Sequence, residues 1–507
     1  MKLRIPNVWL PGLVFAWLLF FAVQALQRPF DGFLAEHVNA PGAAWLAGSL
    51  LAQGLTALLP PEEIMPVLRD VYLFLLLAVP IFSIVVIARH LRQGEGRLDE
   101  SRRDWLLLAS IALLALVAFG CLTYFSNDIY LFRVQGRMLS VAGVNPYAAS
   151  PAQVLPSAQL QNIPWTLQKC AYGPLALLGF EAVTVGNHGV VADFWLLKLL
   201  LAIPFVFVLL LLARHPRLDR RARWVGFAWI GLNPLLLLEI FQNVHLEGWL
   251  GLLLILLLLA LDRVSTGRVA AAGVLFGLAC AIKLSLLALA PIIVVWLWMA
   301  DEERAWQVAL GRIALLALVC VATLAALYWP FWIGGATFDG LQREAGKIIR
   351  SLHALLGAWF GLSPGCLRAC GLAGNLLAAA AGAWICWRRK SLAQGLLVGL
   401  LAQVVLGRTF LQPWHFCPAL LLVPFLGFAA RPPASGGLRW AELRSLLVLS
   451  VSALAGGYVA LLWVPGSRAD LLQTISFLCI VLPPAIWWGI EIWNLKSRIW
   501  NRKDSIY

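Results

Sequence analysis

The chain contains many long runs of apolar residues that few charged residues interrupt, such as residues 190–212 and 307–328. A helix needs about 20 mainly apolar residues to cross the hydrocarbon core of a bilayer. A soluble protein of this size would need polar residues to cover its surface, and this sequence lacks them. The pattern therefore predicts an all-α polytopic membrane protein.

The composition agrees with a lipid environment. Hydrophobic residues make up 61% of the chain and charged residues only 13%, whereas soluble domains carry about 25% charged residues. The formal net charge of +14 would suggest a nucleic-acid partner in a soluble protein. Here the basic residues lie in short loops between apolar runs, without a basic patch that interleaves aromatic residues. We therefore expect the lipid bilayer as a partner, and no nucleic acid.

The apolar runs predict one transmembrane domain over residues 1–507, with about 12–14 spans. Loops rich in Lys and Arg stay in the cytoplasm, so these residues decide the orientation. Placing both termini inside puts most of the 39 Lys and Arg residues on the inner side. The expected spans are residues 8–26, 71–88, 105–124, 190–212, 225–242, 249–261, 269–282, 284–299, 307–328, 371–387, 391–407, 416–430, 445–464 and 470–491.

Two apolar regions are interpreted by the same orientation rule. Residues 171–186 are apolar enough to span, but a span there would move the arginines of 214–223 outside. We therefore predict an outer interfacial or re-entrant segment. Residues 269–299 are too long for one span, and we predict two short helices broken at Lys283. The first span follows basic residues and resembles a signal peptide, but an uncleaved span fits the topology better.

The predicted topology leaves three long outer loops, over residues 27–70, 125–189 and 329–370, and only short inner loops. Long loops carry function more often than short ones, so we expect the active face outside. Cys366 and Cys370 fall in the last of these loops, and a disulfide between them stays an open alternative. The other cysteines show no metal-ligand spacing, and no metal or cofactor is predicted.

The stretch that follows the third predicted span is the richest in chemistry. Asp128 lies at the outer boundary next to Asn127, and Arg133 and Arg137 share one face of the helix that we expect there. An acid beside two cations suits the binding of a phosphate and the deprotonation of a hydroxyl. The alternative is an N-cap acid with two arginines that reach the lipid headgroups, and composition alone favours it. Gln135, Asn145 and Tyr147 follow in the same stretch.

Two more polar positions interrupt the predicted membrane segments. Asn243, His245 and Glu247 alternate through a tight turn where the chain re-enters lipid, and such groups are costly unless they have a function. Lys283 has no acid near it in sequence and is a functional candidate for the same reason. The alternatives are a solvated loop and a lysine that reaches the interface from a helix end.

The segment from Arg408 to His415 lies between two late spans on the outer face. It combines a cation with Gln412, Trp414 and His415, and aromatic rings stack on sugars while an arginine holds phosphate. The alternative is an interfacial aromatic belt with a positive anchor. Trp165 and Tyr172 are expected to shape the entrance of the 125–189 loop. Three further charged residues fall within spans, and the first has no assigned role: Lys198, Glu239 and Arg312.

Together these motifs resemble the C-type glycosyltransferase superfamily, and among its members bacterial polyprenyl-phosphomannose-dependent mannosyltransferases, including glycosyltransferase family 87. The resemblance covers residues 105–430. Two departures are a late Trp-His where Trp-Tyr is more usual, and an acid after the third span instead of the first. The motifs are Asp128, Gly143–Tyr147, Tyr172–Pro174, Asn243–Glu247, Lys283 and Gln412–His415.

The resemblance implies a membrane hexosyltransferase in a C-type glycosyltransferase-like bundle with interfacial helices in the outer loops. The donor would be a polyprenyl-phosphate sugar, with mannose as the expected hexose, and the acceptor a glycan or lipid. Asp128 would be the catalytic base, and the enzyme would lie in the bacterial inner membrane with its site on the periplasmic side. The absence of a second placed carboxylate favours inversion. The alternatives are a flippase, or a surface-glycan ligase or polymerase.

Overall fold

The computed structural model describes residues 9–27, 61–92, 100–121, 123, 126–160, 163, 165–300, 306–426, 440–459 and 474–486. Within these residues the chain is helical, and the only β-type contacts are two isolated bridges. The all-α class predicted from the sequence is confirmed.

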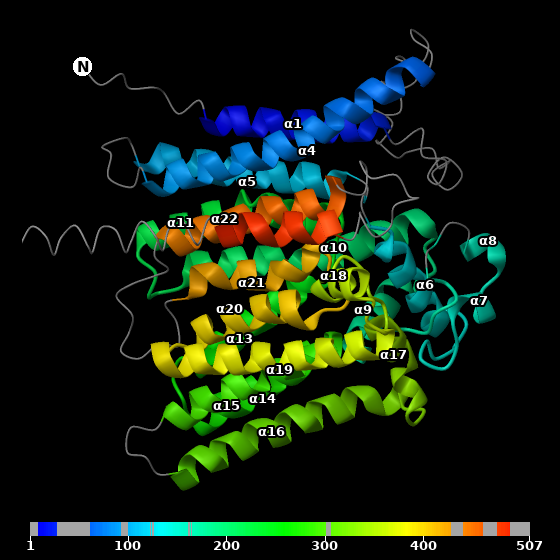
Figure 1. The fold of residues 1–507 in the computed structure, drawn as a ribbon, viewed down its shortest axis with the longest axis vertical. Helices are drawn as coiled ribbons and strands as arrows, with labels where there is room; N and C mark the ends of the chain where they lie inside the picture. Colours follow the sequence, from blue (N-terminus) through cyan, green and yellow to red (C-terminus); the bar gives the residue numbers. More distant parts are fainter. Residues whose placement is uncertain are drawn as a thin grey trace, which may run out of the picture.

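Long helices lie side by side and form the body of the molecule (Figure 1). Central helices such as α13 are almost fully buried. The most apolar stretch of α16 is only 17% buried, so this helix lies at the outside of the bundle. The bounds of the helices are α1 (Trp9–Gln27), α4 (Pro61–Arg92), α5 (Glu100–Gly120), α10 (Val190–Arg214), α11 (Arg220–Gly231), α12 (Pro234–Leu236), α13 (Glu247–Leu261), α14 (Thr266–Ile282), α15 (Ala290–Met299), α16 (Trp306–Tyr328), α19 (Pro364–Arg389), α20 (Leu392–Ala402), α21 (Cys417–Leu422) and α22 (Trp440–Leu454).

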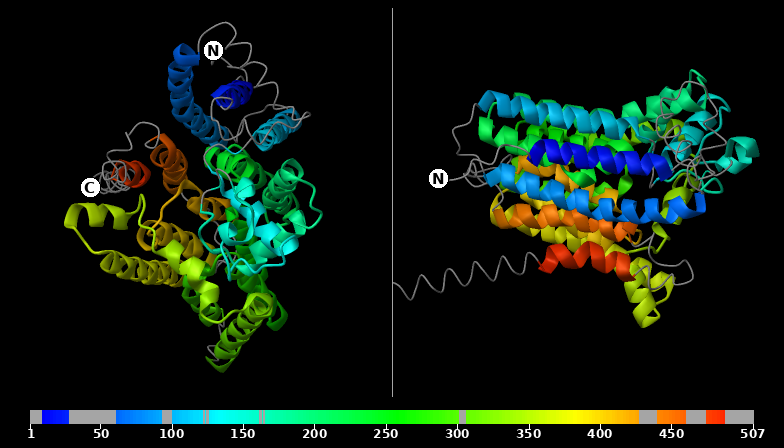
Figure 2. Two further views of the ribbon diagram at one scale, coloured as in Figure 1. Left: turned by 90° about the vertical axis from the view of Figure 1, so that its right-hand side faces the viewer. Right: turned by 90° about the horizontal axis from the view of Figure 1, so that it is seen from above.

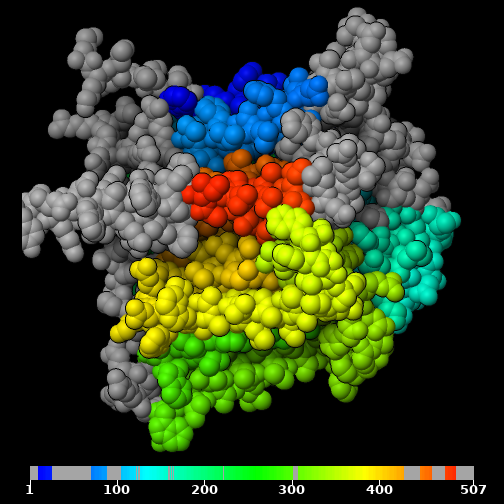
Figure 3. Space-filling view, viewed as in Figure 1, coloured from blue at the N-terminus to red at the C-terminus, as the bar shows by residue number. Residues whose placement is uncertain are grey.

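Short helices gather at one end of this body, at the right of Figure 1 and facing the viewer in the left panel of Figure 2. They come from the two predicted outer loops 125–189 and 329–370, so the structure brings these loops together. Figure 3 shows α18 against the end of α19 on the same side. The bounds are α6 (Asp128–Ser140), α7 (Pro151–Val154), α8 (Ser157–Leu160), α9 (Pro174–Thr184), α17 (Asp339–Ala345) and α18 (Leu352–Phe360).

The helices have the length and the surface that a membrane protein needs. Four described helices can span a bilayer by length and composition, and the pair Ala222–Gly231 and Pro234–Gln242, bent by 50°, passes the same test when its two helices are taken together. Large apolar side chains project outward from them, including Leu318 (68% exposed) and Leu376 (66% exposed). In water such a surface would be costly, whereas lipid solvates it. The chain is therefore a polytopic membrane protein.

Each predicted span coincides with a helix or a pair of helical segments, but many described helices are only 10–17 residues long. The number of crossings therefore stays a prediction. The break at Lys283 is confirmed, because that residue is extended (φ −145°, ψ 100°) between α14 and the 3₁₀ segment Leu284–Leu289. The non-spanning segment 171–186 corresponds to the 11-residue helix α9.

Several predicted boundaries are wrong. Helix α19 begins at Pro364, so Cys366 and Cys370 lie in its first turns instead of a loop, and both are free thiols. The structure therefore shows no disulfide between Cys366 and Cys370, which the sequence left as an open alternative. Helix α4 likewise begins at Pro61, inside the predicted outer loop 27–70. The rest of that loop and both chain termini lie outside the described residues.

Candidate active site

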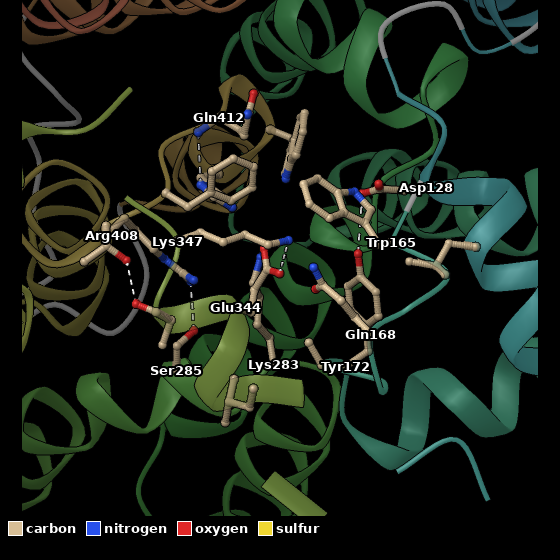
Figure 4. Close-up of a pocket in the computed structure, with 18 of the residues that line it drawn as sticks. Asp128, Trp165, Gln168, Tyr172, Lys283, Ser285, Glu344, Lys347, Arg408 and Gln412 are labelled. Atoms are coloured by element: carbon tan, nitrogen blue, oxygen red, sulfur yellow. Dashed lines mark hydrogen bonds and ion pairs between the residues drawn. The ribbon is translucent and has the colours of Figure 1, made fainter. Parts of the chain in front are cut away.

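A cavity of about 450 Å³ opens at the end of the bundle where the short helices gather. Its volume lies in the range of pockets that hold small ligands, about 300–1,000 Å³. Six segments contribute to its walls: the start of α6, residues 165–172, the break at Lys283, residues 341–347, Asn375 of α19 and residues 407–415. Figure 4 shows Asp128 and Tyr172 on one side of the cavity, and Arg408 and Ser285 on the other.

Asp128 is the first residue of α6, and its backbone amide lies 3.2 Å from the Ser126 hydroxyl. Its carboxylate is 20% exposed and lies 3.8 Å from Nδ1 of His245, and it accepts a hydrogen bond of 3.4 Å from the Tyr172 hydroxyl. Burial raises the pKa of Asp128 above 3.8, although the nearby His245 opposes the shift. A carboxylate with a raised pKa is a better proton acceptor than one free in water.

Tyr172 reaches Asp128 because of the glycine that follows it. The Gly173 amide donates to the Ile282 carbonyl at 2.9 Å, and a Cβ at position 173 would lie 2.0 Å from the Ala281 carbonyl oxygen. Only glycine permits this close approach. The contact places the Tyr-Gly-Pro turn against the end of α14, just before the break at Lys283. Burial raises the pKa of Tyr172 well above 10, so the phenol stays protonated as a hydrogen-bond donor.

His245 is held in a strained turn. The π-helical segment Leu237–Gln242 precedes the turn, and Val244 adopts φ 54°, a left-handed conformation that a β-branched residue rarely takes. Such strain is common at functional sites. The imidazole stacks on Trp414, with 3.9 Å between ring centroids, and its Nε2 lies 3.2 Å from Glu239.

Three carboxylates surround His245. Burial alone would lower the pKa of the imidazole, but Glu239, Asp128 and Glu247 together outweigh burial and raise the pKa above 6.5. Glu239 also accepts a hydrogen bond from the Tyr458 hydroxyl, on the π-helical segment Ala455–Val459. The three carboxylates therefore favour the protonated form of the imidazole beside Asp128.

Two cations differ in how they are neutralised. Lys283 pairs with Glu247 at 2.7 Å, so its acid comes from a distant part of the sequence. Arg408 donates to the Ser285 hydroxyl at 2.8 Å, while its buried Nε has no hydrogen-bond partner and no described acid forms an ion pair with it. Arg408 is therefore available to an anionic ligand in the cavity.

A third π-helical segment positions Arg408. Residues Gln403–Gly407 are π-helical, and the chain becomes extended at Arg408. The Thr409 carbonyl and Leu411 amide then pair with Ile349 at 2.9 and 3.0 Å, which ties this segment to the outer loop 329–370. π-Helical turns occur frequently at functional sites.

The structure brings most of the predicted site residues together. Nine line the cavity: Asn127, Asp128, Gln135, Tyr172, Lys283, Arg408, Gln412, Trp414 and His415. His245 and Glu247 line a smaller hollow directly behind Asp128. These residues come from five separated parts of the chain, which makes their convergence an independent observation.

The arginines of α6 are placed differently. Arg133 pairs with Asp193 at 2.9 Å, and Arg137 lies 3.7 Å from the same carboxylate and donates to Asn187 at 2.8 Å. Neither is among the residues that line the cavity. The predicted helical face is present, but it turns toward the start of α10 and away from Asp128. The partner, Asp193, was not identified from the sequence.

Three other predicted ligand-binding residues support the local structure. Asn145 donates to the Phe331 carbonyl at 2.9 Å, and the Tyr147 hydroxyl donates to the Tyr172 carbonyl at 2.6 Å. Asn243 donates to Glu239 at 3.3 Å. Lys198, which had no assignment, is buried beside the ends of α5 and donates to the Ala118 carbonyl at 3.5 Å.

Sequence analysis missed several residues of the cavity wall. Ser285 lies two residues after Lys283, and Glu344 and Lys347 lie in the long outer loop 329–370, which was the available signal for them. Thr409 and Phe410 lie within the predicted segment from Arg408 to His415, and the remaining residues carry no motif. The residues that were not named are Gln168, Lys169, Ser285, Glu344, Lys347, Asn375, Thr409 and Phe410. Among the described residues, no group of three His, Cys, Asp or Glu is placed to hold a metal ion.

An acid, an imidazole and an arginine without an acidic partner among the described residues thus gather at one end of a helical bundle with a membrane-protein surface. A sequence profile of a family described as "Alpha-(1->6)-mannopyranosyltransferase, N-terminal domain" (MptA_B family) matches residues 32–300, more than half of the chain. The chain belongs to this family of mannosyltransferases. No curated protein and no solved structure matches the chain. The predicted resemblance to mannosyltransferases of the glycosyltransferase family 87 type is thereby confirmed.

Proposed function

We propose that the protein transfers mannose from a polyprenyl-phosphate donor to a glycan or lipid acceptor, forming an α-(1→6) bond at the outer face of a bacterial inner membrane. The observation that carries the proposal is the placement of Asp128 and Arg408 on opposite sides of one cavity. A transfer reaction needs a base for the acceptor hydroxyl and a positive charge for the departing phosphate.

Asp128 is the general base of the proposed mechanism. The acceptor oxygen attacks the anomeric carbon of the donor while its proton passes to the Asp128 carboxylate. Such help accelerates proton-coupled steps by about 10²–10⁴-fold. The raised pKa of Asp128 suits this role, and the Tyr172 hydroxyl at 3.4 Å orients the carboxylate.

Arg408 stabilises the leaving group. The bond between the anomeric carbon and the phosphate oxygen breaks as the new bond forms, and the electron pair leaves with the polyprenyl phosphate. Arg408 has no acidic partner among the described residues, and Ser285 holds its guanidinium in place. The Lys283 ammonium adds positive charge nearby, although Glu247 partly neutralises it.

A single displacement of this kind inverts the anomeric centre, so an α-linked product requires a β-linked donor. In the described residues of the cavity wall, the second carboxylate besides Asp128 is Glu344, which pairs with Lys347. Retention would need a second carboxylate at the anomeric carbon, whereas inversion needs only the base Asp128.

The proposal is tested with purified protein in liposomes. Wild type should transfer mannose from polyprenyl-phosphate mannose and not from a nucleotide sugar. Asp128→Asn should lose the activity, while Asp104→Asn, at the opposite end of the bundle, should retain it. Transfer from a nucleotide sugar alone, or passage of the donor across the membrane without a glycosidic product, would refute the proposed reaction.

A further inference from the structure

Trp165 is an unusual residue in the cavity wall. It adopts φ 66°, a left-handed conformation that is rare for a bulky aromatic residue, and its side chain is 41% exposed. Hydrogen bonds fix the turn around it: the Gln168 amide donates to the Trp165 carbonyl at 2.9 Å, and the Ala152 amide donates to the Thr166 carbonyl at 2.9 Å. A strained backbone that holds an exposed aromatic ring in a cavity suggests a ligand for that ring.

The indole ring is also held in place by a cation. Lys347 Nζ lies 3.4 Å from the ring centroid and pairs with Glu344. This interaction orients the ring and occupies one of its faces. A ligand can therefore stack only on the other face. Trp165 and Lys347 together form a platform for a ligand. Trp165 comes from the outer loop 125–189 and Lys347 from the outer loop 329–370, so the platform depends on contact between these loops.

The neighbours of Trp165 indicate the chemistry of the ligand. Gln168 and Lys169 line the same part of the cavity and offer an amide and an ammonium group, and the Lys169 ammonium also pairs with Asp339 at 2.9 Å. Sugar rings present C–H groups that pack on an aromatic face and hydroxyls that bond to such polar groups. A prenyl chain would leave the Gln168 amide without a partner, at a cost in desolvation.

The position of the platform separates it from the donor phosphate. Trp165 lies on the side of Asp128 and Tyr172, whereas Arg408 and Ser285 lie on the opposite side (Figure 4). In the proposed reaction the base must face the acceptor hydroxyl. We infer that Trp165, with Gln168 and Lys169, forms the subsite for a saccharide acceptor. The assignment of this saccharide as the acceptor rests on the proposed function.

The test uses a substitution that the backbone tolerates. Glycine adopts φ 66° without strain, so Trp165→Gly removes the ring while leaving the turn intact. Trp165→Tyr keeps an aromatic face. The matched control is Trp329→Gly, because Trp329 is 81% exposed at the same end of the bundle but outside the cavity wall.

We expect Trp165→Gly to raise the KM for an α-(1→6)-mannobiose acceptor by about tenfold or more, with the KM for the donor unchanged and Trp165→Tyr in between. Trp329→Gly should behave like wild type. An unchanged acceptor KM in Trp165→Gly, or a rise in the donor KM instead, would overturn the subsite.

A binding experiment without the donor separates this inference from the proposed reaction. Saturation-transfer NMR on the full-length protein should detect α-(1→6)-mannobiose, and Trp165→Gly should abolish the signal. If mannobiose binding depends on Trp165 but the protein does not use polyprenyl-phosphate mannose as a donor, the proposed donor is wrong and the saccharide subsite stands. If mannosyl transfer is normal and Trp165→Gly still gives the mannobiose signal, the proposed reaction stands and the subsite is wrong.

Discussion

Two charged clusters begin on the same helix, α6, and differ in what surrounds them. Arg133 and Arg137 both contact the fully buried Asp193, away from the residues that line the cavity. Asp128, five and nine residues earlier, faces a cavity that also contains Arg408, a cation without an acidic partner among the described residues. The first cluster pairs its arginines with an acid inside the protein, whereas the second leaves a cation facing a cavity.

The comparison shows what helical spacing can and cannot reveal. Spacing of four residues places two arginines on one face, but it does not say which part of the fold that face meets. Buried ion pairs whose members satisfy each other contribute to structure, and removing one member is strongly destabilising. Charge left unsatisfied beside a cavity is the better sign of a binding site.

The largest expected difference between the clusters is in turnover. Asp128→Asn removes the proposed base and should lower kcat by about 10²–10⁴-fold in a mannosyl-transfer assay. Asp193→Asn should reduce the yield of folded protein while leaving kcat of the purified fraction within a few-fold of wild type. Equal losses of kcat in both variants would show that the clusters do not differ in function.

Arg408→Gln should have the next largest effect. Loss of the cation opposite Asp128 should lower kcat/KM for the donor by about 10²–10³-fold, because the leaving phosphate is no longer stabilised. The matched control is Arg388→Gln. Arg388 is exposed near the C-terminal end of α19, away from the cavity, so this variant should leave the steady-state kinetics unchanged. A donor kcat/KM in Arg408→Gln that equals the control would contradict the role.

Substitutions in the cluster of Arg133, Arg137 and Asp193 should lower the stability of the protein. Arg133→Met leaves Asp193 without its closest cation and should lower the free energy of unfolding by about 3–5 kcal/mol. Arg133→Met combined with Asp193→Leu removes both charges and should recover most of this loss. Thermal unfolding of the purified protein in detergent measures both changes. A double variant no more stable than the single one would show that the ion pair is not the cause.

The pH dependence should show the smallest effects. Activity requires the Asp128 carboxylate, so it should fall as the pH drops through a pKa raised above 3.8 by burial. The pKa of His245 is raised above 6.5. A contribution of its imidazolium to activity should therefore disappear as the pH rises through this raised pKa. His245 also lowers the pKa of Asp128, so His245→Gln should remove the alkaline limb and move the acid limb to higher pH.

A profile of kcat/KM against pH for wild type and His245→Gln measures both limbs. An alkaline limb that survives in His245→Gln would assign it to another group. An acid limb that moves to lower pH would contradict the electrostatic coupling between His245 and Asp128.

The fold was predictable because it depends on chemistry that is local in sequence. Each predicted span is an apolar run, and the described helices follow these runs, including the break at Lys283. Helix ends were less predictable. The start of α19 at Pro364 follows from Ser363, whose side chain accepts from the Cys366 amide, a cap within an otherwise ambiguous loop.

The site was predictable only in part, because charged residues in lipid are conspicuous but their partners are not. Asp128, His245, Lys283 and Arg408 could be named because each interrupts or borders an apolar run. Their relations depend on contacts between distant segments, such as Lys283 with Glu247. Trp165 could be named but not its left-handed backbone, since tertiary contacts impose that conformation.

The central claim, that Asp128 acts in the chemical step, is best tested by single-turnover kinetics. Protein saturated with polyprenyl-phosphate mannose is mixed with excess acceptor, and the rate of mannosyl transfer is compared between wild type and Asp128→Asn. The account predicts equal donor occupancy and a transfer rate that falls by about 10²–10⁴-fold in the variant. An unchanged transfer rate in Asp128→Asn at full donor occupancy would contradict it.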